Sequence, residues 1–531
     1  MKPSPDNSSN PNPSEREPGF FNFFGGWGMG RRLLFAFACL VTLIAVFYVE
    51  ENWRGKRAWE NYKREWEAKG EKFDLQAFVP PPVPDEQNFA MTPFLAPLFD
   101  FNPKPLMPGQ SAWRDTNALK RVQNLGENLK FQDSSSRGSW TKGQRIDFQA
   151  WALSFRGKEK SATKPAASSI TRKEAAEELL KDLGEYAPVL QELQVASQRP
   201  NARFNIGYGD DYPSGILLPH LAVMKKAGLM FETKALAELE LGRSDEALSD
   251  ARMIVYLSGT AKAEPFLISG LVRITLVNIA MEPLWEGLAD HQWSDAHLAD
   301  WEEQLGKIDL LADYAATMRG ERGLNNSGLD YLRKGGHMEV MSDSGAPQSV
   351  NVISIMPSGW FYQNQLTISR MYERYVFPRV DAAAHRVYSN GLVNDEAVVY
   401  ANELSRGFSP YKIFARLLFP AYGNAALKFA AAQVNVDLAR VACALERHRL
   451  AHGEFPQTLD SLSPQFIKAI PHDIFSGEPL KYHRTEDGKF VLYSVGWNQK
   501  DDGGEIGMTT GKNPHVFINE GDWVWPQYPA K

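Results

Sequence analysis

The stretch HLAVMKKAGLMFETKALAELELGRSDEALSDARMIVYLSG, His220–Gly259, decides the fold. Apolar residues recur at helical spacing on both sides of Gly242, as in two amphipathic helices joined by a short turn. Ser244 stands where a helix N-cap is expected, and acidic residues follow it in the first turn. Small side chains occupy the positions where the two helices would approach: Ala235, Ala247 and Ala251. The stretch therefore predicts a closely packed helical hairpin.

Over residues 235–255 this hairpin resembles the helix pair of a tetratricopeptide repeat. The segment SDAHLADWEEQLGKIDLLADYAATMRGERG, Ser294–Gly323, follows the same pattern, with Ser294 as N-cap and leucines at helical spacing. No clear second copy of the hairpin recurs at the repeat length of about 34 residues. We therefore expect a mainly α fold: an irregular helical array over residues 169–334, then a loop and a second helical block over residues 335–424.

A membrane anchor is predicted near the N-terminus. Residues 33–49, LLFAFACLVTLIAVFYV, contain no charged side chain, and a helix of this length can cross a thin hydrocarbon core. An arginine pair precedes this run and a glutamate pair follows it: Arg31, Arg32, Glu50 and Glu51. Because basic residues favour the cytoplasmic side, the N-terminus should lie inside the cell and the rest of the chain outside it.

This pattern predicts a single-pass protein of the inner (cytoplasmic) membrane, with its anchor at residues 31–50 and its body on the outer or periplasmic side. Residues 1–30 are rich in Pro, Asn, Ser and Gly, which predicts a disordered cytoplasmic tail. A cleaved signal peptide would need a small-x-small site, and VFYVEENW offers none. A buried helix of a soluble protein is the remaining alternative.

Residues 51–168 should begin with a helix that continues out of the membrane. Trp59, Tyr62 and Trp66 fall on one face of such a helix. The proline-rich stretch FVPPPVPDEQNFA then ends it, because consecutive prolines force extended geometry and remove amide donors. We interpret that stretch as a rigid spacer, followed by an irregular region with a short strand or helix around DFQAWAL.

Composition excludes some classes of function. The chain has 531 residues, a net charge of −6 and a pI near 6.0, so it lacks the basic surplus of a nucleic-acid-binding protein. Its two cysteines, Cys39 and Cys443, lie far apart in different predicted helices, which makes a disulfide or a zinc site improbable.

No catalytic motif is present: the chain has no HExxH, no GxSxG, no GxxxxGK[ST] and no GxGxxG in a strand context. His448 and His452 share a helix face and could bind a metal. A helix C-terminus closed by Gly453 explains them better, because cationic residues are favoured there. An enzyme is therefore possible but unsupported, and no catalytic residue is predicted.

The C-terminal region, residues 425–531, predicts a small α+β domain. A long helix ends in ALERHRLAHGEFPQTLDSL, a turn of the form Asp-x-Phe-x-Gly follows at Asp473, Phe475 and Gly477, and the strand LYSVG precedes an acidic Gly-Gly loop. These features, with the terminal GDWVWP, resemble the globular part of the major pseudopilins of type II secretion systems. The whole arrangement is similar to large anchored proteins of the bacterial envelope that carry this C-terminal type.

The resemblance implies a calcium site in the acidic loop. In the pseudopilins the corresponding loop binds calcium, an ion that prefers several hard oxygen ligands. Asp501 and Asp502 would supply carboxylates, Gly503 and Gly504 would allow a tight turn, and Asp522 would return to complete the site. A solvated, metal-free acidic turn is an equally good interpretation, and a catalytic carboxylate pair is a poor one.

The sequence favours a role in protein–protein interaction. A helical array offers surfaces for partners, and no reaction centre is apparent. We expect a membrane-anchored scaffold or adaptor of the cell envelope, with a role related to secretion as one form of it and with protein partners that the sequence does not identify. A pseudopilin-like secretion subunit and an envelope enzyme with a site assembled from distant residues are the alternatives.

Overall fold

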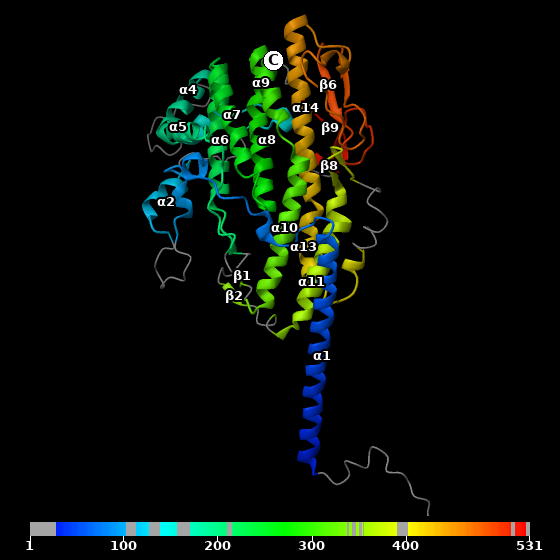
Figure 1. Cartoon of the computed structure of the whole chain (residues 1–531). Helices are drawn as coiled ribbons and strands as arrows, with labels where there is room; N and C mark the ends of the chain where they lie inside the picture. Colours follow the sequence, from blue (N-terminus) through cyan, green and yellow to red (C-terminus); the bar gives the residue numbers. More distant parts are fainter. Residues whose placement is uncertain are drawn as a thin grey trace, which may run out of the picture.

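The structure, a computed structural model, describes residues 28–101, 113–126, 138–156, 170–209, 215–336, 339–341, 347–349, 353, 355–389, 402–510 and 516–526. The predicted cytoplasmic tail lies almost wholly outside these residues. Figure 1 shows a body of long helices that run side by side, with one helix projecting from it as a stalk.

The stalk is α1, Met29–Glu67, one continuous helix of 39 residues. No residue in its most apolar window is buried, whereas its later part packs on the body. The buried residues of that part fall on one face: Glu51, Gly55, Trp59 and Tyr62. The predicted continuation of the helix beyond the apolar run is confirmed, and the aromatic stripe is the face that contacts the body.

One further described helix is long and apolar enough to cross a membrane, namely α8, Leu267–Ala289. In α8, 67% of the apolar window is buried within the body. A helix that is apolar on all sides and surrounded by other helices is a core helix, so α8 needs no membrane to explain its composition.

Short elements connect α1 to the array. The 3-10 helices are η2 Leu75–Phe78, η3 Asp85–Gln87, η4 Phe89–Met91, η5 Ala96–Phe99 and η6 Trp140–Lys142. Two short α-helices accompany them, α2 Thr116–Gln123 and α3 Phe148–Arg156. In the proline-rich stretch the backbone is extended at Val79 and at Pro84, with ψ angles of 126° and 139°. The element around DFQAWAL is the helix α3.

The predicted helical array is confirmed. It consists of α4 Arg172–Leu183, η8 Gly184–Tyr186, α5 Ala187–Ala196, α6 Pro219–Glu240, α7 Ser244–Thr260, α8, α9 Asp295–Gly306 and α10 Leu310–Arg333. The three alanines between α6 and α7 are fully buried, as a close helical hairpin requires.

One predicted cap is wrong. Arg243, not Ser244, occupies the N-cap position of α7, and the Ser244 hydroxyl donates a hydrogen bond to the carbonyl of Gln292 at 3.0 Å. A contact with the loop before α9 has therefore replaced the local cap. Ser294 does cap α9, where its side chain accepts a hydrogen bond from the amide of His297.

The second helical block is present but interrupted. It contains α11 Ser358–Met371, a π-helical turn Tyr372–Val376, η12 Phe377–Arg379 and α13 Ile413–Gly423. The long helix α14, Ala425–His452, follows and opens the C-terminal region. Two antiparallel hairpins flank α11: β1 Glu339–Met341 with β2 Pro347–Ser349, and β3 Val380–Asp381 with β4 Arg386–Val387. Gly453 ends α14 with a positive φ of 83°, as predicted for a left-handed C-cap.

The small C-terminal sheet is also confirmed. After η13 Leu459–Leu462, three antiparallel strands follow in the spatial order β5 Lys481–Arg484, β6 Phe490–Ser494 and β9 Trp523–Val524. A separate antiparallel hairpin joins β7 Ile506–Met508 to β8 Val516–Gly521. Figure 1 shows these strands beside α14.

The sheet and the array share one hydrophobic core, which extends from Leu75 to Trp525. The Trp525 ring lies against that of Trp140, with 5.8 Å between centroids. The indole of Trp285 in α8 donates a hydrogen bond to the carbonyl of Pro526 at 3.1 Å. The end of the described chain is therefore fastened into the helical array.

Candidate functional sites at the anchor junction and the acidic loop

The first candidate site is the lower junction, where α1 leaves its apolar run and meets α11. Glu51 is buried there, and its carboxylate accepts hydrogen bonds from the Arg54 guanidinium, from the Tyr411 hydroxyl at 2.9 Å and from the Trp360 indole at 3.0 Å. The side chain of Asn52 accepts a hydrogen bond from the amide of Gly359 at 2.8 Å. The contacts of Trp360, Gly359 and Tyr411 join the helix to residues 307 to 360 positions later in the chain.

Two glycines let the helices touch at this junction. A Cβ built on Gly359 would collide with the carbonyl of Glu51, and one built on Gly55 would collide with the backbone of Gly359. Such backbone contact is possible only without side chains at both positions. Glycine at these two positions therefore fixes how closely α1 and α11 can pack.

Above this crossing, an aromatic cluster holds the helix. Trp59 stacks on Tyr62 with 6.1 Å between centroids, and Phe73 meets both rings edge-on at 5.5 and 5.8 Å. Leu366 of α11 completes this small core. Aromatic pairs in such geometries each add about 0.5–1.5 kcal/mol beyond the burial of their surface.

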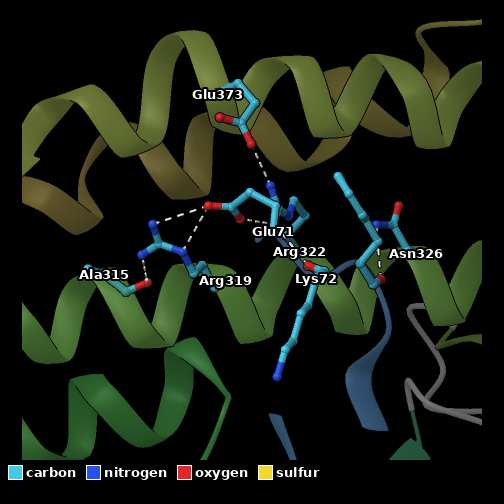
Figure 2. Close-up of polar contacts among 8 residues, drawn as sticks. Glu71, Lys72, Ala315, Arg319, Arg322, Asn326 and Glu373 are labelled. Atoms are coloured by element: carbon cyan, nitrogen blue, oxygen red, sulfur yellow. Dashed lines mark hydrogen bonds and ion pairs between the residues drawn. The ribbon is translucent and has the colours of Figure 1, made fainter. Parts of the chain in front are cut away.

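The upper junction is an ionic network centred on Arg322 of α10 (Figure 2). Arg322 is fully buried, and its guanidinium donates to Glu373 at 2.6 Å, to Glu71 and to the carbonyl of Lys72 at 2.9 Å. Arg319 also reaches Glu71, at 3.3 Å. Glu71 belongs to the segment that follows α1, so the network joins that segment to α10 and to the turn after α11.

Electrostatics differ between the two junctions. Burial raises the pKa of Glu373, because the nearby Arg322 does not fully offset desolvation and the repulsion from Glu71. At the lower junction burial is outweighed, and hydrogen bonds from Arg54, Tyr411 and Trp360 hold the pKa of Glu51 below its usual value. The lower carboxylate is thus well compensated, whereas the upper network depends on its one buried arginine.

The second candidate site is the predicted acidic loop, whose residues the structure does bring together. The Asp522 carboxylate accepts hydrogen bonds from the amides of Asp502 at 3.1 Å and Gly504 at 2.7 Å. Asp501 accepts from the Tyr493 hydroxyl at 3.0 Å and lies 3.3 Å from the Lys481 ammonium. The loop is therefore folded around Asp522.

One oxygen of this site lacks a hydrogen-bond partner. Asp522 is buried, and its Oδ1 accepts no hydrogen bond from the described residues. Desolvation, together with the charges of Asp501 and Asp502, raises the pKa of Asp522. The two neighbouring aspartates each have a lysine partner: Lys481 lies 3.3 Å from Asp501, and Lys500 lies 3.2 Å from Asp502. Among the described residues, no group of three or more acidic, histidine or cysteine side chains has the spacing of a metal site.

The histidine pair at the end of α14 is engaged with the backbone. His448 Nδ1 lies 3.0 Å from the carbonyl of Glu454, and His452 Nδ1 lies 3.1 Å from the carbonyl of His448. Both rings stack on each other at 4.2 Å. These contacts fit the helix-terminus interpretation of the pair.

A cavity of about 640 Å³ adjoins the upper junction. Its lining includes Tyr314, Arg319, Phe377, Asp381 and Tyr388. Its walls combine the aromatic side chains of Tyr314, Phe377 and Tyr388 with two charged ones.

Sequence reasoning identified the acidic loop and the aromatic stripe but missed both junctions. Arg322 occurs in an ordinary polar stretch of a helix, and its partners Glu71 and Glu373 lie 251 and 51 positions away. Of the junction residues, Glu51 alone stands out in the sequence, as an acidic residue at the end of the apolar run. That position predicts the orientation of the helix and not its packing on the body.

Comparison of the chain with protein-family models, with curated proteins and with solved structures finds no match in any of the three. The geometry of the two sites and the helix that carries the body are therefore the basis of the function proposed below.

Proposed function

We propose that the protein is a single-pass scaffold of the cell envelope, with residues 33–49 spanning the cytoplasmic membrane and the body held rigidly outside it. The observation that supports this most strongly is the difference in burial between the two halves of α1. Its apolar half is exposed, while the half that follows is buried against the body on one face. Seventeen uncharged residues left exposed in water would be costly, and a bilayer removes that cost.

A signal sequence is the competing interpretation of an apolar N-terminal helix. The continuity of α1 supports the span, because cleavage just after residue 49 would divide one unbroken helix and remove Phe47 and Tyr48, which contact the body at Trp360 and Ile355. The junctions give an uncleaved anchor a purpose: they fix the body relative to the helix, which a scaffold needs in order to present its surfaces at one height.

The test is protease digestion of spheroplasts that express the full chain with one tag at Met1 and another at Lys531. We expect the body to be digested and a short fragment with the Met1 tag to survive. Changing Arg31→Glu with Arg32→Glu should produce a mixed population, because the charge asymmetry that orients the helix is lost. Lys56→Glu with Lys63→Glu removes two cations on the other side and should leave the orientation unchanged.

Two outcomes contradict the proposal. If the body is protected in intact spheroplasts and digested only after lysis, the orientation is wrong. If alkaline extraction releases the full-length chain from the membrane, the span itself is wrong.

A second proposal concerns secretion. The resemblance to pseudopilins suggests a secretion-related scaffold whose acidic loop binds calcium through Asp501, Asp502 and Asp522. The buried Asp522 oxygen without a hydrogen-bond partner supports this, because a cation beside it would give a ligand to an oxygen that no hydrogen bond from the described residues reaches.

A further inference from the structure

The base of the body has exposed apolar residues beside the end of the apolar run of α1. The first segment is Ile355–Trp360, the loop residues before α11 together with its first turn, which we call the basal loop. The Tyr48 hydroxyl donates a hydrogen bond to the carbonyl of Ile355, and the Phe47 ring meets that of Trp360 edge-on at 6.4 Å. Phe47 and Tyr48 belong to the uncharged run, so the basal loop lies level with residues assigned to the membrane.

The direction of helical side chains strengthens this placement. Side chains of an α-helix point toward its N-terminus, and the N-terminus of α1 lies at the far end of the stalk, away from the body (Figure 1). The hydroxyl of Tyr48 therefore lies no higher than its own backbone. The Ile355 side chain, at this level, is 68% exposed in the structure.

A second segment, Gly407–Tyr411, lies at the same end of the body. The Tyr411 hydroxyl bonds to the Glu51 carboxylate, and the Arg54 guanidinium lies over the Tyr411 ring at 5.4 Å. Phe408, three residues before Tyr411, is 85% exposed. A single exposed apolar side chain needs no explanation, but Phe408 and Ile355 lie at the same end of the body as the exposed apolar run of α1 and extend its apolar surface.

Charge identifies the occupant as lipid. Phe408 is flanked in sequence by Arg406 and Lys412, and Arg57 lies over the exposed ring of Trp53 on the next turns of α1. Basic residues beside apolar and aromatic ones are the composition of surfaces that lie at the boundary of headgroups and acyl chains. Anionic headgroups would attract these cations.

We propose that the body touches the membrane at a second place besides the span, with Ile355 and Phe408 inserted among the lipids. This inference rests on the proposed span, because α1 sets the level of the bilayer. The contact would restrain the tilt of the body, which one helix alone would leave free.

The experiment uses the full chain, reconstituted in vesicles of equal parts phosphatidylcholine and phosphatidylglycerol. In a Cys39→Ser background, a nitroxide label is placed by Ile355→Cys or Phe408→Cys; Cys443 is fully buried in α14 and should not react. Two reference sites are similarly exposed, Leu43→Cys within the span at 67% and Val195→Cys on α5 at 68%. Spin relaxation then compares access of oxygen, which favours lipid, with access of a water-soluble nickel complex.

We expect labels at Ile355 and Phe408 to favour oxygen over nickel several-fold more than the label at Val195, as the label at Leu43 does. If Leu43 is in lipid while both basal sites behave like Val195, the second contact is refuted and the span stands. If Leu43 itself behaves like Val195, the span fails and this inference fails with it. Dipolar broadening between labels, with both reagents excluded, would mean that a second copy covers the patch and would also refute lipid contact.

Discussion

The Arg322 network allows the sharpest test of how the segment after α1 is held to the body. Arg322→Met removes the one buried cation that compensates Glu71 and Glu373 and leaves two carboxylates facing each other. Removing one partner from a buried ionic network costs about 3–5 kcal/mol. Arg319→Met is the matched control, because Arg319 contacts the same Glu71 but is 40% exposed, and a partly exposed pair is worth about 0–1 kcal/mol.

Hydrogen–deuterium exchange of the full chain in detergent measures the local opening free energy of the amides around this network. In Arg322→Met, the amides of Lys69–Asp74 and of α10 around position 322 should exchange faster, with a local opening free energy lower by about 3 kcal/mol or more. Adding Glu71→Gln and Glu373→Gln to Arg322→Met should recover much of the loss, because no buried charge then remains. If Arg322→Met costs no more than Arg319→Met, or if the triple variant is worse than the single one, the compensation argument is wrong.

Three further outcomes are expected. Gly359→Ala should lower the free energy of unfolding, measured by urea titration, by about 1–3 kcal/mol, because the added methyl group overpacks the contact with α1. Gly184→Ala is the control: a Cβ there meets open space, so the change should be neutral or slightly stabilising. Calcium should raise the melting temperature of the parent, and Asp522→Asn should abolish that rise; an unchanged melting temperature at millimolar calcium would leave the loop a plain turn. The Asp437 carboxylate, 3.5 Å from the His385 ring, raises the pKa of His385 above 6.5. The stability that this pair contributes is therefore present below pH about 6.5 and is lost as the pH rises through the higher folded value. His385→Asn should flatten this part of the pH profile, and an unchanged slope would contradict the assignment.

Local pattern predicted the elements of this fold well. The uncharged run and the aromatic stripe predicted one long helix, and the spacing around Gly242 predicted the α6–α7 hairpin, because both signals lie within a few turns of chain. The strand predicted at LYSVG likewise overlaps β6. The spacing of apolar residues and the local composition can be taken from a few turns of chain, and these elements depend on little else.

Features that depend on distant partners were out of reach. Ser244 satisfies every local rule for an N-cap, yet a carbonyl 48 positions away binds its hydroxyl. Gly55 and Gly359 look like ordinary helix-weakening glycines until the two helices are brought into contact. The acidic loop was found because its residues are clustered and its resemblance is local, while the buried Asp522 oxygen appeared only once the chain was folded.

The unbroken course of α1 also has a mechanical consequence. From Val49 to Glu67 the helix rises about 27 Å without a hinge, at 1.5 Å per residue. In a membrane, such a stiff helix, packed on the body, would restrict the body to a narrow layer above the bilayer and limit its tumbling. Partners in that layer would meet it after losing little further orientational freedom, so even a weak contact surface could capture them, whereas a flexible tether of the same length would spread the body through a much larger volume.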